Sequence, residues 1–265
     1  ENIIFIVGSP RSGTTVFGEI LDLHSEINQW YEPYFIWDKY FRLSPDDNRT
    51  EQDATKQVAN YVRNSFWRYQ SKSKCKFLVD KSPRNSLKIP FIRSIFPNAR
   101  FIHIIRDGRD VTLSINKEWL NRLSIVKGQK DRPKFDYIKV SSVISTWLKR
   151  QPFIGDRLQA FWHETHGHIL DKERHTNKLR WKGNNGWGPR FAGWEELLAG
   201  NTLVQFNAYQ WKKCVESCLI DLDAVEEKKK LIIHYEDFTE KPEEVIRRTL
   251  NFIGATDDHT CVERF

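Results

Sequence analysis

The stretch Gly8–Thr15, which reads GSPRSGTT, restricts the fold of this chain more than any other feature. It follows the apolar run Ile3–Val7 and precedes a segment whose apolar residues recur at helical spacing over 16–21. We therefore expect a strand, a loop and a helix in succession. Small residues let backbone N–H groups close around an anion, and the helix N-terminus adds its dipole. The stretch predicts a phosphate or sulfate site.

One position separates this loop from an ordinary ATP or GTP loop. The two glycines have the Walker spacing, but Thr14 stands where a lysine should follow Gly13. The positive charge lies inside the loop instead, at Arg11, whose planar guanidinium suits bidentate binding of a tetrahedral oxyanion. A plain glycine turn between core elements is the alternative interpretation.

Strand and helix patterns alternate along the rest of the chain. We predict further buried strands over 76–80, 100–105 and 231–235, and helices over 54–70, 87–96, 202–220 and 242–253. This alternation favours an α/β fold with a central parallel sheet flanked by helices on both faces, like that of the P-loop nucleotide hydrolases. A single domain over 1–265 is expected. The polar segment 43–53, with its proline and adjacent aspartates, is predicted to be a surface loop.

A second anion site is predicted beyond the 100–105 strand. Arg106 follows that strand and Ser114 lies farther along the next helix. Because open α/β sheets bind ligands at the carboxyl ends of their strands, these two residues can hold an anion distinct from the one at Arg11. Two separate anion sites indicate a doubly phosphorylated nucleotide. Arg109 and Asp110 are instead expected to form an exposed ion pair at the start of the helix.

Composition excludes some classes of function. The net charge of +7 suits anionic ligands, but Lys and Arg are scattered, so nucleic acid is not the favoured partner. No apolar run is long enough to span a membrane. The oligomeric state cannot be predicted from these features.

The spacing of the cysteines and histidines indicates whether disulfides or a metal site are to be expected. Cys75, Cys214, Cys218 and Cys261 form no C-x2-C pair, which favours reduced thiols over a secretory-pathway bridge. The histidines of the run 162–168 miss the H-E-x-x-H spacing of zinc proteases, so no metal is expected. We therefore favour a cytoplasmic location. A location in the Golgi lumen is the alternative, if an anchoring segment lies upstream of the sequence.

Three motifs taken in order resemble the sulfotransferases that use 3′-phosphoadenosine-5′-phosphosulfate (PAPS). The loop 9–15 resembles the family's 5′-phosphosulfate loop, Arg106 and Ser114 have the eight-residue spacing of its 3′-phosphate site, and Tyr235–Phe238 with Pro242 resembles a structural strand and helix near its end. The resemblance implies PAPS as donor, adenosine 3′,5′-bisphosphate (PAP) as product and no metal. The donor-binding residues that it implies are Ser9, Pro10, Arg11, Ser12, Gly13, Thr14, Thr15, Arg106 and Ser114.

The resemblance also implies the catalytic residues. The match is to the tyrosylprotein and bacterial branch, whose loop carries Arg and whose base is a Glu about twenty residues farther on; Glu32 holds that position. Its aromatic neighbours favour a desolvated carboxylate. We expect in-line transfer in which Glu32 takes the acceptor proton while Arg11 and Lys81 stabilise developing charge. Asp80 is the reserve candidate for the base.

The acceptor is expected to bear a hydroxyl group on a small molecule, a carbohydrate or a tyrosyl peptide. Its contacts should come from a helical, variable region at about 116–220. Two other functions stay open from sequence alone. The first is a P-loop kinase or NTPase, which shares the fold but has the loop lysine that is absent here. The second is a nucleotide-binding module without turnover, since a fold does not guarantee a function.

Overall fold

The computed structural model describes residues 2–126, 181, 186–256 and 261. Its contacts group the chain into two compact units, of which the first comprises 1–40, 46–115 and 188–265 and the second 41–45 and 116–187. In the second unit, the rings of Trp119 and Trp181 pack edge to face with their centroids 5.6 Å apart. All residues of the site lie in the first unit. A single domain over 1–265 stays a prediction.

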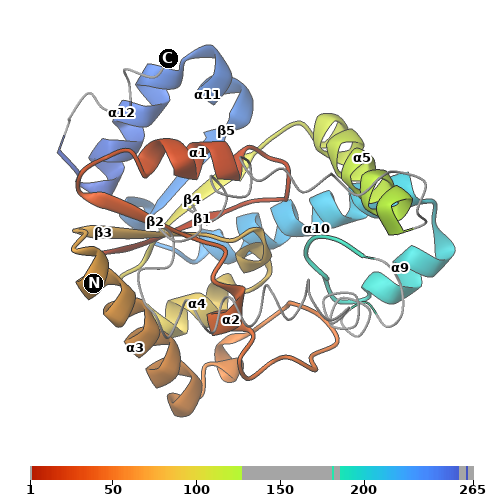
Figure 1. The fold of residues 1–265 in the computed structure, drawn as a ribbon, viewed down its shortest axis with the longest axis horizontal. Helices are drawn as coiled ribbons and strands as arrows, with labels where there is room; N and C mark the ends of the chain where they lie inside the picture. Colours follow the sequence, from red (N-terminus) through yellow and green to blue (C-terminus); the bar gives the residue numbers. More distant parts are fainter. Residues whose placement is uncertain (1, 127–180, 182–185, 257–260, 262–265) are drawn as a thin grey trace. The chain divides into compact units, whose positions relative to one another are not determined.

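The predicted α/β fold with a parallel sheet is confirmed. The described part of the chain contains a five-stranded sheet of order β2-β3-β1-β4-β5, in which every neighbouring pair is parallel (Figure 1). The strands are β1 (Ile3–Val7), β2 (Ile27–Tyr31), β3 (Phe77–Lys81), β4 (Arg100–Ile105) and β5 (Lys230–His234). The helices are α1 (Thr14–Leu21), α2 (Tyr34–Trp37), η1 (Glu51–Asp53), α3 (Lys56–Ser73), η2 (Pro83–Leu87), α4 (Ile89–Ile95), α5 (Gly108–Val126), α9 (Trp194–Gly200), α10 (Leu203–Asp223), η3 (Glu227–Lys229), α11 (Tyr235–Glu240) and α12 (Pro242–Ile253).

Helices cover both faces of the sheet, as the alternation of patterns predicts. Side chains of β1 alternate between the faces: Ile4 and Ile6 pack in the cluster formed with α1 and α12, whereas Phe5 packs against Phe66 of α3 and Phe96 after α4. Figure 1 shows α1 and α12 on one side of the sheet and α3 and α4 on the other. The central strand β1 is fully buried because it has a neighbour on each side and helices on each face.

Local signals explain where the helices begin and end. Thr55 caps α3 by accepting a hydrogen bond from the Val58 N–H, and Thr202 with Gln205 forms a capping box on α10. Pro242 opens α12, and Gly254 ends it with a φ of 78°, as predicted.

One strand prediction needs correction, and one strand was not predicted. The segment 230–234 is a strand but not a buried one: it lies at the end of the described sheet, and Ile232 is 38% exposed although Ile233 is buried. Burial is incomplete because an outer strand has a neighbour on one side only. The strand Ile27–Tyr31 was not predicted, because the polar residues Asn28 and Gln29 interrupt its apolar pattern.

The four cysteines are free, as their spacing predicts. Cys214 and Cys218 lie buried on α10, and burial raises the pKa of the Cys218 thiol to about 12. Both are therefore thiols at neutral pH, packed as small apolar side chains.

Candidate active site

The predicted anion loop forms the turn from β1 into α1. Arg11 and Gly13 both adopt left-handed backbone conformations, with φ values of 67° and 86°, and Gly13 is the N-cap residue of α1. The first N–H groups of a helix have no intrahelical acceptor. The loop therefore presents free backbone donors and one guanidinium at the same turn, which is the arrangement that an anion requires.

Gly13 leaves room for an aromatic ring. A Cβ atom built on Gly13 would lie 2.3 Å from Cδ2 of Tyr235, the first residue of α11. The ring of Tyr235 also contacts the Arg106 guanidinium, whose Cζ lies 4.5 Å from the ring centroid. Tyr235 thus joins the two predicted anion sites. The sequence indicates only a structural strand for Tyr235, whereas the residue opens α11, and its position in the sequence gives no sign of what its ring contacts.

Replacing Gly13 with alanine tests this close approach. We expect Gly13→Ala to lower the free energy of unfolding by about 1–3 kcal/mol through backbone strain, with a further cost from the clash with Tyr235. Gly254→Ala is the matched control, because Gly254 has a φ of 78° but no atom within 4 Å of an added Cβ. Denaturant unfolding of the two variants checks this. Equal losses of stability would show that the Tyr235 ring moves aside at no cost.

Ser86 holds the start of the loop. The Gly8 N–H donates to Ser86 Oγ at 2.9 Å, and the Ser86 hydroxyl donates to the Gly8 carbonyl at 2.9 Å. Ser86 lies in η2, so the turn after β3 supports the loop after β1. This residue was not predicted, because a serine 78 residues from its partner carries no local signal.

Two buried donors in the site have no hydrogen-bond acceptor among the described residues. They are the Ser12 hydroxyl and the Arg106 Nε. A buried donor without an acceptor costs free energy, so such groups usually have a partner that is absent from the protein chain itself. One belongs to the predicted 5′-phosphosulfate loop and the other to the predicted 3′-phosphate site. Both predicted sites therefore fit an anionic ligand.

The two predicted anion sites lie in direct contact. Arg11 Nε donates to Ser114 Oγ at 2.9 Å, and Arg106 Nη1 donates to the Arg11 carbonyl at 3.4 Å. The structure thus brings Arg11, Arg106 and Ser114 together from the ends of two neighbouring strands.

The predicted ion pair between Arg109 and Asp110 is wrong. Arg109 pairs with Asp107, at 2.6 Å from Nη2 to Oδ2, whereas Asp110 lies 3.5 Å from Nη2 of Arg106, one helical turn back. Adjacent residues on a helix point in different directions, and residues four apart lie on the same face. Hydrogen bonds from Arg109 hold the pKa of the Asp107 carboxyl low, at about 2.

The turn between β4 and α5 is held from the side by α10. Trp211 Nε1 donates to the Arg106 carbonyl at 3.2 Å, and a Cβ atom on Gly108 would lie 2.8 Å from the Trp211 ring. A cavity of about 1020 Å³ opens beside Arg106, and its walls include Leu113, Tyr209 and Trp211. Trp211 therefore fixes the backbone that carries Arg106. An isolated tryptophan in a helical pattern gave no indication of this contact.

Glu32 and Lys81 form an ion pair. Lys81 Nζ lies 2.6 Å from Glu32 Oε1, and the lysine side chain is fully buried while that of the glutamate is 26% exposed. The ammonium also lies 3.8 Å from the centroid of the Tyr31 ring. Glu32 follows β2 directly, and its φ of 46° is left-handed. In the part of the chain that the structure describes, Oε2 of Glu32 makes no hydrogen bond, so one oxygen is available to a ligand.

Asp80 is committed to the protein interior. Its carboxylate accepts hydrogen bonds from Trp37 Nε1 at 2.8 Å, Ser82 Oγ at 2.5 Å and Asn85 Nδ2 at 3.2 Å. The side chain is 0% exposed, and burial raises the pKa of the carboxyl to about 6. The Asp80 carboxylate thus accepts three hydrogen bonds inside the protein, and a bound substrate hydroxyl cannot reach it.

Strand order sets the layout of the site. Lys81 pairs with both Tyr31 of β2 and Ile6 of β1, and β1 pairs on its other side with β4. The anion loop therefore leaves the middle of the sheet, with Glu32 and Lys81 on one side and Arg106 on the other. Neighbouring strands lie about 4.8 Å apart, so all these groups share one edge of the sheet within a few strand spacings.

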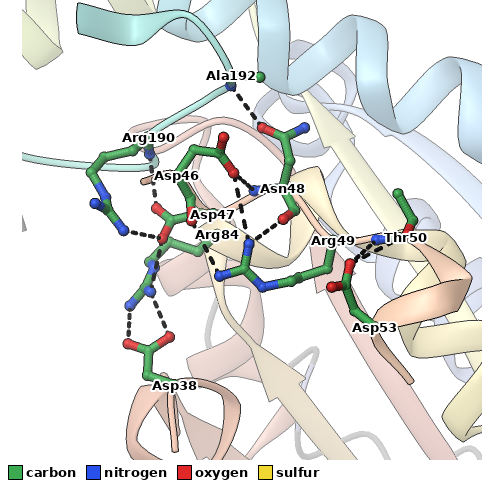
Figure 2. A network of polar contacts seen from close by, with 10 residues as sticks. All are labelled: Asp38, Asp46, Asp47, Asn48, Arg49, Thr50, Asp53, Arg84, Arg190 and Ala192. Atoms are coloured by element: carbon green, nitrogen blue, oxygen red, sulfur yellow. Dashed lines mark hydrogen bonds and ion pairs between the residues drawn. The ribbon is translucent and has the colours of Figure 1, made fainter. Parts of the chain in front are cut away.

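The segment 43–53 is not simply a surface loop. Asp47 is 1% exposed and accepts hydrogen bonds from the Arg190 N–H at 2.8 Å and from Arg84 Nη2 at 3.0 Å (Figure 2). The prediction was wrong for this residue because its buried partners, both arginines, lie 37 and 143 residues away. Polar composition indicates a loop but does not exclude a buried ion pair.

No helix among the described residues is long and apolar enough to span a membrane. No group of three or more His, Cys, Asp or Glu side chains among those residues could hold a metal ion. The histidine-containing run 162–168 lies outside the described residues.

Known proteins resemble this chain in sequence and in fold. Protein-tyrosine sulfotransferase A of Caenorhabditis elegans is 33% identical over 129 residues, and protein-tyrosine sulfotransferase 1 of Homo sapiens is 29% identical over 117 residues. The matches cover 42% and 40% of this chain but only 32% of each relative, so the chain spans about a third of their length.

The fold is that of solved sulfotransferases. The sulfotransferase domain from the curacin biosynthetic pathway superposes with a TM-score of 0.57 at 16% identity, over 98% of this chain and 76% of that domain. The sequence profile of the sulfotransferase family matches residues 3–175, which include the anion loop, Glu32, Lys81, Arg106 and Ser114. This chain belongs to the sulfotransferase family.

Proposed function

We propose that this chain transfers a sulfuryl group from PAPS to an acceptor hydroxyl. The observation that carries the proposal is the arrangement along one sheet edge: a paired carboxylate and lysine, then an anion loop, then a second anion site. The buried, unpartnered donors Ser12 Oγ and Arg106 Nε support a ligand with two anionic groups. Membership of the sulfotransferase family supports the reaction class.

In the proposed reaction, the acceptor oxygen attacks the sulfur in line with the bond to the 5′-phosphate oxygen. A new S–O bond forms as the old one breaks, the acceptor proton passes to Glu32 and PAP leaves with the electron pair. Arg11 and Lys81 stabilise charge on the sulfuryl oxygens and the leaving phosphate. By analogy with phosphoryl transfer, positioning and electrostatics supply most of the catalysis, without a covalent intermediate or a required metal.

Glu32 is the better candidate for the base than Asp80. One Glu32 oxygen is held by Lys81, and the partly exposed side chain leaves the other oxygen without a hydrogen bond within the described ranges. Asp80 is fully buried, and its carboxylate accepts hydrogen bonds from three neighbouring side chains. A general base must reach the proton that it removes.

Arg106 is proposed to bind the 3′-phosphate. We expect Arg106→Ala to weaken PAP binding by about 10- to 100-fold, because a charge-assisted hydrogen bond contributes about 1.5–3 kcal/mol. Isothermal titration with PAP checks this. Arg109→Ala is the matched control, because Arg109 is 89% exposed and pairs with Asp107. Unchanged PAP affinity in Arg106→Ala would contradict the assignment.

A ligand comparison separates this function from a P-loop kinase or NTPase. Stabilisation by a ligand grows with its concentration relative to Kd, so PAP should raise Tm and ATP with Mg²⁺ should not. The opposite result would favour the kinase. A rise with PAP but no sulfuryl transfer to any acceptor would favour a binding module without turnover.

The acceptor is to be sought with ³⁵S-labelled PAPS. A screen of acceptors begins with a tyrosyl peptide, because the relatives are named protein-tyrosine sulfotransferases. A phenol, an aliphatic alcohol and a carbohydrate follow. Residues at about 116–220 are proposed to contact the acceptor. Transfer of label to none of the four classes would contradict the proposed function. The cytoplasmic location and its Golgi-lumen alternative stay predictions.

A further inference from the structure

The residues that follow Glu32 are held by the end of β3 and by η2. The helix α2 begins two residues after Glu32 and ends at Trp37, whose Nε1 donates to Asp80 at 2.8 Å. Asp38, the C-cap of α2, accepts two hydrogen bonds from Arg84 of η2, at 2.9 Å from Nη1 and 2.7 Å from Nη2. This is the bidentate geometry that fixes direction as well as distance.

Arg84 contacts both ends of α2. Its guanidinium carbon lies 4.3 Å from the centroid of the Tyr34 ring, at the first residue of the helix, and its nitrogens bind Asp38 just after the last. A single helical turn is not stable by itself, because nucleation costs more than one turn of hydrogen bonds returns. The position of α2 is therefore set by contacts with the rest of the protein: the polar contacts with Arg84 and Asp80, and the packing of the buried Trp37 ring against Phe5, Phe66 and Phe91.

Glu32 needs this support. Its φ of 46° is unfavourable for a residue other than glycine and costs on the order of 1 kcal/mol. The Glu32 carbonyl accepts a hydrogen bond from the Tyr34 N–H at 2.6 Å, which links this turn directly to α2. If α2 moves, the Glu32 backbone can relax and its carboxylate moves with it.

Arg84 is itself fixed by a chain of alternating charges. The ion pairs run from Asp38 to Arg84, from Arg84 to Asp47 and from Asp47 to Arg190 (Figure 2). Of these four residues, only Asp38 adjoins α2. Burial opposes the charge of Arg84, but the carboxylates of Asp38 and Asp47 raise the pKa of its guanidinium. Arg84 therefore stays charged, and its guanidinium keeps its two hydrogen bonds to Asp38.

We infer that Arg84 and Asp38 are positioning residues for Glu32. They act through α2: the bidentate pair holds the helix, and the helix holds the strained turn that aims the carboxylate. This inference rests on the proposed function, in which Glu32 is the base. It predicts that Asp38 and Arg84 affect kcat only through the position of Glu32.

Asp38→Asn tests the inference. Asparagine has the same shape, but its amide group would face a guanidinium donor, so the second hydrogen bond is lost. We expect kcat, measured with ³⁵S-PAPS and the acceptor from the screen, to fall by about 10- to 100-fold, the cost of misplacing a reacting group. The KM for PAPS should stay within about twofold, because neither residue contacts the predicted donor-binding groups.

A double-mutant comparison separates positioning from a general structural role. In a Glu32→Gln background, Asp38→Asn should lower the residual rate by less than about twofold, because the base it positions is already gone. Equal factors in both backgrounds would overturn the inference. If Glu32→Gln alone keeps the full rate, the assignment of the base is wrong, which is a different result.

Two further variants control for folding. Asp47→Asn disturbs the same network but leaves the Arg84–Asp38 pair, so it should lower Tm more than it lowers kcat. Arg84→Lys keeps the charge but cannot form two parallel hydrogen bonds, so it should resemble Asp38→Asn. It also serves if Asp38→Asn does not fold. Full activity of Arg84→Lys would overturn the inference.

Discussion

Replacing Glu32 with glutamine is expected to lower kcat by about 10²- to 10⁴-fold, the range for loss of a general base. Glutamine keeps the length of the side chain and one oxygen for Lys81, but it cannot accept the proton of the acceptor hydroxyl. Affinity for PAP should change little, because Glu32 lies on the opposite side of the anion loop from Arg106. Steady-state transfer from ³⁵S-PAPS, with PAP titration in parallel, measures both quantities.

The chain offers a matched control for this substitution. Glu26 and Lys76 form an ion pair of 2.9 Å just before β2 and β3. This pair lies at the opposite end of the two strands from Glu32, which follows β2, and Lys81, which ends β3. Glu26→Gln makes the same chemical change away from the proposed site, and kcat should stay at the level of the unmodified protein. A retained rate in Glu32→Gln would transfer the role of base to another group.

Replacing Arg11 with alanine is expected to lower kcat by about 10²- to 10³-fold, the typical loss when one donor to developing charge is removed. The guanidinium lies in the loop that is proposed to bind the 5′-phosphosulfate, where negative charge grows as the S–O bond breaks. Its effect on PAP affinity should be smaller than that of Arg106→Ala, because PAP has lost the sulfuryl group. Single-turnover transfer and PAP titration separate the two effects.

Ser114→Ala controls for the contact that Arg11 makes in this structure. It removes the 2.9 Å hydrogen bond from Arg11 Nε but keeps the guanidinium. We expect Ser114→Ala to weaken PAP binding and to leave kcat at saturating PAPS nearly unchanged. If Arg11→Ala and Ser114→Ala give the same loss of kcat, then Arg11 acts through Ser114 and not on the sulfuryl group.

Continuous apolar runs made the central strands predictable. β1, β3 and β4 have neighbours on both sides, so their side chains are mostly apolar and their bounds follow from sequence to within one residue. β2 was missed and the burial of β5 was overestimated, because outer strands mix buried and exposed positions. The anion loop was predictable for a different reason: its glycines and arginine are adjacent, and the geometry they form is local.

Contacts between distant segments could not be predicted. Lys81 and Glu32 are 49 residues apart, and Arg84 and Asp38 are 46 residues apart. Each of these residues has an ordinary exposed interpretation when taken alone. Asp47 and Arg84 were not expected to be buried, because a charged residue is buried only when its partner is present, and the partner is known only from the fold.

The sequence by itself determined the α/β class, the anion loop and the identity of the charged groups at the strand ends: Arg11, Lys81 and Arg106. These follow from local patterns, since apolar periodicity and loop composition act over a few residues. Only the tertiary structure decided the strand order, which puts the loop between Glu32 and Arg106, and the pairings of Lys81 and Arg84. Crossover connections between parallel strands leave that order open, because a helix can carry the chain to either side of the sheet.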